Sequence, residues 1–142
     1  MRRIASIIVI VLASVAATGC AGSGQSKADE AKSQACDASA DIKAQIATLT
    51  NLPLSTSSVD TAKTSLQKID TDLKTISEAA PKVSDDLRSQ LQAANATFKT
   101  QVQGATEAIT SAQSLTDAAA AVAAAGSTLQ ASYENAFADV SC

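Results

Sequence analysis

The chain has 142 residues and a formal net charge of −3; 46% of the residues are hydrophobic and 2% are aromatic. This length suits one domain, and the composition predicts a thin core of Ala with Ile, Leu and Val. A net negative charge argues against nucleic-acid binding, which needs a basic face to neutralise phosphates. The chain has no histidine. Because metal centres need several Cys, His or carboxylate ligands at suitable spacing, we expect neither a metal nor another cofactor.

The first twenty residues combine a basic start, an apolar run and small residues before a cysteine. Arg2 and Arg3 precede an apolar run over 4–17, which leads into the tetrapeptide Ala17-Thr18-Gly19-Cys20. This pattern resembles a bacterial lipoprotein signal, although Ala17 stands where a larger aliphatic residue is commonest. The resemblance implies that residues 1–19 are a signal peptide. It also implies that Cys20 carries a diacylglyceryl anchor, with or without a third acyl chain such as palmitate.

Two other readings of the N-terminus remain open. The apolar stretch from Ile4 to Gly19 has 16 residues, fewer than the roughly 20 that a membrane-spanning helix needs. A spanning anchor and a soluble secreted product are therefore the alternatives to lipidation. Loss of Arg2 and Arg3 with the signal leaves nine basic and 14 acidic side chains, a net charge of −5. This balance argues against electrostatic docking on anionic lipid. We expect residues 20–26 to form the lipidated start and flexible tether, and 27–142 to form one helical domain.

The cysteines also indicate an exported protein. If Cys20 carries lipid, Cys36 and Cys142 remain as an even pair, and export permits a disulfide between them. Such a bridge would close a loop of about 107 residues and stabilise the fold by about 4 to 5 kcal/mol in the chain-entropy model. Two unpaired thiols, or a Cys20–Cys36 bridge in an unlipidated protein, are the alternatives.

The first half of the domain predicts two helices. The first covers 27–50 and ends in a turn over 51–54, where Pro53 stands. Its inward positions are Ala35, Ile42, Ile46 and Leu49. The second begins near Ser57, which with Asp60 forms an imperfect capping box, and Pro81 marks a break or kink after it. Its apolar residues alternate at spacings of three and four: Val59, Ala62, Leu66, Ile69, Leu73 and Ile76.

The second half predicts two more helices. The third starts near Ser84, where Asp85 and Asp86 favour the positive end of the helix dipole. Its apolar positions are Val83, Leu87, Leu91, Ala94, Phe98, Val102, Ala105 and Ile109. The fourth begins near Ser114 or Thr116 and crosses Gly126, which costs about 1 kcal/mol relative to Ala. Its apolar positions are Val122, Leu129, Tyr133, Phe137 and Val140.

These elements predict an all-α, antiparallel up-down bundle of four helices. A continuous helix through Pro81 would reduce the number to three, which is the main alternative. An even number of antiparallel helices returns the C-terminus to the end where the first helix begins, so Cys36 and Cys142 can meet there. Four helices and one disulfide between the two ends of the domain are therefore mutually consistent.

The sequence suggests a partner surface but no catalytic site. Asp70 and Asp72, like Asp85 and Asp86, are interpreted as solvated helix positions, because a calcium loop needs several oxygen ligands around a glycine turn. Without histidine there is no Ser-His pair, and no Gly-x-Ser-x-Gly elbow is present, so we do not expect an enzyme. No Lys or Arg occurs from Thr100 to Cys142. We therefore predict a partner surface on the third and fourth helices, including Ala121 and Gln130.

As a whole, the chain resembles small lipoproteins of actinobacterial type. These are rich in Ala, Ser, Thr and Asp, and often place one cysteine soon after the tether and another at the C-terminus, as Cys36 and Cys142 stand here. The resemblance implies a lipid-anchored protein on the extracytoplasmic face of the cell membrane.

The expected role is non-enzymatic, either structural or in binding an envelope protein that the sequence does not identify; the oligomeric state stays open. The alternative is a carrier of lipid or another apolar ligand. Its site would open between the helices around Ile69, Phe98, Leu129 and Phe137.

Overall fold

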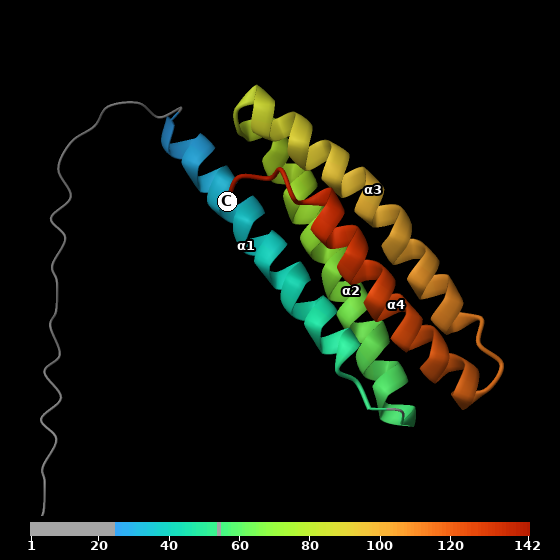
Figure 1. Ribbon diagram of the computed structural model, residues 1–142. Coiled ribbons are helices and arrows are strands. Elements are labelled where there is room, and N and C mark those ends of the chain that lie inside the picture. Colours follow the sequence, from blue (N-terminus) through green and yellow to red (C-terminus); the bar gives the residue numbers. More distant parts are fainter. Residues whose placement is uncertain (1–24, 54) are drawn as a thin grey trace, which may run out of the picture.

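The computed structural model describes residues 25–53 and 55–142 and shows a four-helix bundle. Its helices are α1 (Gln25–Thr50), α2 (Thr56–Ala79), α3 (Asp85–Thr110) and α4 (Leu115–Ala136), with a short 3-10 helix η1 (Ala80–Lys82) between α2 and α3. The long helices run up and down in turn (Figure 1). The predicted all-α, antiparallel fold is confirmed. The predicted signal peptide and the lipidation of Cys20 lie outside the described residues.

Each helix buries one apolar stripe in a common core. In α2, the residues spaced by three and four are all buried: Ala62, Leu66, Ile69, Leu73 and Ile76. In α3 the corresponding stripe consists of Leu91, Ala94, Phe98, Val102, Ala105 and Ile109. Because residues three and four apart share one face of a helix, this spacing decides which side chains meet in the core. The helical pattern read from the sequence therefore corresponds to the observed packing.

A clear break separates α2 from α3, so the three-helix alternative is wrong. The break comprises η1, which contains Pro81, and the extended residue Val83 (φ −94°, ψ 178°). Proline lacks a backbone N–H and clashes with the preceding turn of an α-helix. Arg88 closes the corner: its Nη2 donates to the Pro81 carbonyl oxygen at 3.4 Å, and its Nη1 pairs with Asp85 at 3.1 Å.

Two predicted helix starts differ from the structure. α1 begins at Gln25, two residues before the expected start at 27, so Gln25 and Ser26 are helical. Gln is a good helix former and Ser is tolerated near a helix start. α2 begins at Thr56, with Ser55 as its N-cap in extended conformation. The predicted start near Ser57 is therefore late, because Ser55 rather than Ser57 takes the N-cap position.

The last helix ends four residues earlier than its apolar pattern extends. α4 stops at Ala136, and the chain from Phe137 to Cys142 turns away from the helix axis toward α1 (Figure 1). There Cys142 forms a disulfide with Cys36, with the two Cα atoms 5.5 Å apart. A helix continued through Val140 would carry Cys142 along the α4 axis and away from Cys36. This disulfide confirms the predicted pair and excludes both unpaired thiols and a Cys20–Cys36 bridge.

The helices are arranged so that each contacts its neighbour in sequence and α1 closes the bundle against α4. Gly126 allows this closure, because a Cβ atom there would lie 3.2 Å from the Thr50 backbone nitrogen. The two ends of the bundle therefore differ. One end holds the start of α1, η1 and the disulfide, and the other holds the connections over 51–55 and 111–114. Among the described residues, no helix has the length and apolarity needed to cross a membrane.

Candidate functional site

The disulfide end is held by aromatic packing and by a hydrogen bond between α1 and α4. Phe98 contacts Tyr133 and Phe137 edge-on at centroid distances of 5.9 and 6.0 Å, and Tyr133 stacks on Phe137 at 4.8 Å. The Tyr133 hydroxyl donates to the Ser39 carbonyl oxygen at 2.9 Å and lies 2.7 Å from the Ser39 hydroxyl. The Tyr133 hydrogen bond ties α4 to α1, and the Cys36–Cys142 bridge ties the C-terminal segment to α1. The ring contacts of Phe98 tie both α4 and this segment to α3.

The residues predicted to surround an apolar ligand lie in the packed core. Ile69, Phe98 and Leu129 are fully buried, and Phe137 is 8% exposed. Aromatic rings of the same chain pack around Phe98. An open cleft lies elsewhere, between α2 and α3. A carrier function stays a prediction from the sequence.

The predicted partner surface on α3 and α4 stays a prediction, but its two named residues differ in exposure. α3 and α4 pack side by side. Gln130 is exposed on α4, where its amide donates to Glu134 at 3.3 Å. Ala121 is only half-exposed and packs against the core. Because a lysine at Ala121 would disturb this packing, the exposed Ala124 is the better position at which to test the surface.

The outward face of α4 is unusually free of charge. No charged residue occurs between Ala118 and Tyr133, and the exposed side chains over this range are small or neutral: Ala120, Ala123, Ala124, Ser127, Thr128, Gln130 and Ala131. At the start of the same helix Leu115 is 48% exposed. A surface of this kind has a low desolvation cost when another protein covers it.

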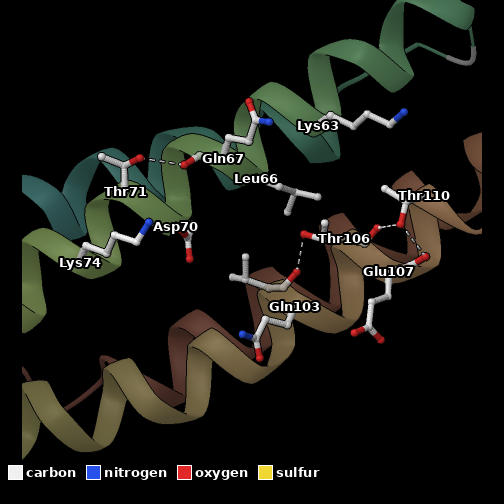
Figure 2. A pocket seen from close by; sticks show the side chains of 11 residues that line it. Lys63, Leu66, Gln67, Asp70, Thr71, Lys74, Gln103, Thr106, Glu107 and Thr110 are labelled. Carbon is white, nitrogen blue, oxygen red and sulfur yellow. Dashed lines mark hydrogen bonds and ion pairs between the residues drawn. The ribbon is translucent and has the colours of Figure 1, made fainter.

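An open cleft of about 730 Å³ runs between α2 and α3. Figure 2 shows Leu66 and Asp70 pointing from α2 toward α3, with Thr106 facing them. Asp70 pairs with Lys74 at 2.9 Å, and both side chains are exposed. The volume lies within the range of small-ligand sites. No sequence pattern predicts this cleft, because it depends on the spacing between two helices rather than on a motif.

The polar groups of the cleft are largely engaged within their own helices. The hydroxyls of Thr71, Thr106 and Thr110 each donate to the carbonyl oxygen four residues earlier, at 3.0, 2.9 and 2.8 Å. The ion pair of Asp70 and Lys74 is of the common i,i+4 type. The cleft therefore has the hydrogen-bonding character of a solvated helix surface. The prediction that the chain is not an enzyme stays untested.

The acidic residues singled out from the sequence occupy different environments. Asp70, Asp85 and Asp86 lie on the surface or at its edge, and Asp70 and Asp85 form the two ion pairs described above. Asp72 is half-buried between α1 and α2. Burial raises the pKa of Asp72 above 3.8, the Asp41 carboxylate raises it further, and Lys68 opposes both effects. Asp72 is therefore not the fully solvated position that the sequence suggested.

Comparison of the chain with known protein families, with curated proteins and with solved structures finds no match. Among residues 25–53 and 55–142, no three His, Cys, Asp or Glu side chains are grouped as a metal site would require.

Proposed function

We propose that this chain is a lipid-anchored envelope protein that presents a disulfide-clamped helical bundle for a structural or protein-binding role. The observation that carries the proposal is the pairing of Cys36 with Cys142. Because these two cysteines are joined to each other, Cys20 is the one cysteine left for lipidation at the end of the signal-like segment. Disulfides persist in oxidising compartments outside the cytoplasm, which agrees with export by that segment.

The fold supports an orientation on the membrane. A lipid at Cys20 would anchor the end of the bundle that holds the start of α1 and the disulfide. Helix α1 has 26 residues and extends about 39 Å at 1.5 Å per residue. The connections over 51–55 and 111–114 would therefore face away from the membrane. The uncharged face of α4 would stand upright along the bundle and remain accessible to a partner.

The anchoring proposal is tested by the intact mass of the full chain extracted from membranes, before and after reduction. We expect a mass that lacks residues 1–19, includes a diacylglyceryl group and gains two hydrogens on reduction. A Cys20→Ala variant should lose the lipid and leave the membrane fraction while keeping the disulfide. An unlipidated mass for the unaltered chain would contradict anchoring at Cys20.

The partner surface is tested by pull-down from membranes with the double variant Ala124→Lys/Gln130→Lys. Both positions are exposed on α4, so the fold should persist and captured partners should be lost. Lys43→Gln, an exposed position on α1, is the matched control and should retain them. Unchanged partners in the α4 variant would place the binding surface elsewhere.

A further inference from the structure

A second pocket lies at the end of the bundle from which the chain leads back to Cys20. It measures about 390 Å³ and is lined by Lys27, Glu30, Ala31 and Gln34 of α1 and by Lys82 of η1. Ala31 is buried, whereas the four polar side chains are exposed. Two cations from separate elements therefore face one pocket, together with one carboxylate and one neutral amide.

The break between α2 and α3 is what brings Lys82 to α1. η1 packs directly against α1, and Arg88 holds η1 in place through the Pro81 carbonyl oxygen. The guanidinium of Arg88 is itself paired with Asp85. Neither Lys27 nor Lys82 forms an ion pair with any other residue in the described part of the chain. Their ammonium groups are therefore available to an anion from outside the protein.

The charges around the pocket select the kind of anion. Lys27 and Lys82 suit a phosphate group, and the Gln34 amide can donate a further hydrogen bond to its oxygens. Glu30 would repel a ligand that is only anionic, but it would accept hydrogen bonds from a primary ammonium beside the phosphate. The phosphoethanolamine group carries both charges close together. The net negative charge of the chain acts in the same direction, since it disfavours a strongly anionic surface.

The position of the pocket brings it close to the headgroups of the anchoring membrane. If Cys20 is lipidated, only residues 21–24 separate the anchor from the start of α1. A chain extends at most about 3.6 Å per residue, so Lys27 lies within roughly 20 Å of the anchored cysteine. A tether this short holds the pocket at a high effective concentration of headgroups, about millimolar, so that a weak site is sufficient.

We infer that the α1–η1 pocket binds the phosphoethanolamine headgroup of a phospholipid in the anchoring membrane. The inference rests on the proposed function for the source of its ligand. Binding would hold the disulfide end of the bundle against the membrane and restrict its rotation about the tether.

The first test measures hydrogen exchange over residues 25–36 of the full lipidated chain in three kinds of vesicle. These contain phosphatidylcholine alone, or phosphatidylcholine mixed with phosphatidylethanolamine or with phosphatidylglycerol. We expect exchange to slow at least about threefold only with phosphatidylethanolamine. The double variant Lys27→Gln/Lys82→Gln should lose this protection, and the matched variant Lys43→Gln/Lys63→Gln, away from the pocket, should keep it. Equal exchange in all vesicles, or stronger protection with phosphatidylglycerol, would overturn the inference.

A second test does not depend on lipidation. Glycerophosphoethanolamine is titrated into the full chain in detergent, and the backbone amide NMR signals of Lys27–Gln34 are followed, with glycerophosphate as the comparison. We expect saturable shifts at millimolar concentration that are weaker with glycerophosphate and absent in the Lys27→Gln/Lys82→Gln variant. The absence of any shift would overturn the headgroup site, even if Cys20 carries lipid. If the unaltered chain carries no lipid but shows these shifts, the headgroup site stands and the anchoring proposal alone fails.

Discussion

At the scale of single residues, Gly104 and Gly126 show how similar sequence positions differ in the fold. Both lie inside helices, but a Cβ atom at Gly104 would have no neighbour within 4 Å. At Gly126 it would lie 3.2 Å from the Thr50 backbone nitrogen and 3.3 Å from the Leu49 carbonyl carbon. The α1 backbone must move to admit it. Gly126 therefore has a packing role that Gly104 lacks.

Alanine substitution should separate these two glycines. Gly104→Ala should stabilise the protein by about 0.5 to 1 kcal/mol, the ordinary gain in helix propensity. Gly126→Ala should show no gain or a loss, because contact with α1 offsets the propensity, and Gly126→Val should destabilise by about 1 to 3 kcal/mol. Urea unfolding followed by circular dichroism measures these changes. Equal stabilisation by both alanines would mean that α1 and α4 do not approach so closely.

Asp72 makes stability depend on pH. Its folded-state pKa is raised, chiefly by burial and secondly by Asp41, so the folded protein holds this proton more tightly than the unfolded chain does. Its contribution is therefore favourable at acidic pH and is lost as the pH rises through the folded pKa. Asp72→Asn should stabilise the protein at pH 7, by less than about 0.5 kcal/mol because the group is partly exposed.

The pH dependence of unfolding measured from pH 3.5 to 7 checks this prediction. In Asp72→Asn, the loss of unfolding free energy that Asp72 causes as the pH rises over that range should be absent. Asp41→Asn should remove only part of this loss, because it leaves the burial of Asp72 unchanged. A pH profile identical to that of the unaltered chain in both variants would contradict a raised pKa.

At the scale of helices, the N-caps of α3 and α4 look alike in sequence but differ in structure. The Ser114 hydroxyl accepts a hydrogen bond from the Asp117 backbone nitrogen at 3.1 Å and donates to the Asp117 carboxylate at 2.6 Å. Ser84 occupies the same position before α3, yet its side chain makes no capping hydrogen bond. Ser114→Ala should cost about 1 kcal/mol, and Ser84→Ala, the matched control, should cost less than about 0.5 kcal/mol. Thermal unfolding compares them; equal losses would show that the cap at Ser114 adds nothing specific.

At the scale of the whole molecule, the disulfide joins the first helix to the last residue. It spans 106 positions of the chain, so it removes much conformational freedom from the unfolded state. Cys142→Ser should therefore lower the free energy of unfolding by about 3 to 5 kcal/mol. The double variant Cys36→Ser/Cys142→Ser should match the single variant and should not respond to reductant. If reduction leaves the denaturation midpoint of the unaltered chain unchanged, the bridge does not stabilise the fold.

The sequence by itself determined the fold class and favoured the Cys36–Cys142 pair. The alternation of apolar residues from Val59 to Ile76 defines one helix face whatever the rest of the chain does, because a helix turns every 3.6 residues. Pro81 breaks the chain for an equally local reason, its missing N–H. The pairing of Cys36 with Cys142 was expected if Cys20 carries lipid, and the even number of helices that these signals predict is consistent with it.

Only the tertiary structure decided what depends on distances between helices. The partial burial of Ala121 and of Asp72 arises from neighbours on other helices, and no local signal marks it. The end of α4 at Ala136 reflects the position of Cys36, a hundred residues earlier in sequence. The cleft between α2 and α3 and the presence of Lys27 and Lys82 in one pocket likewise depend on how helices pack against each other. Periodicity places a residue on a face of its helix, but packing decides what that face meets.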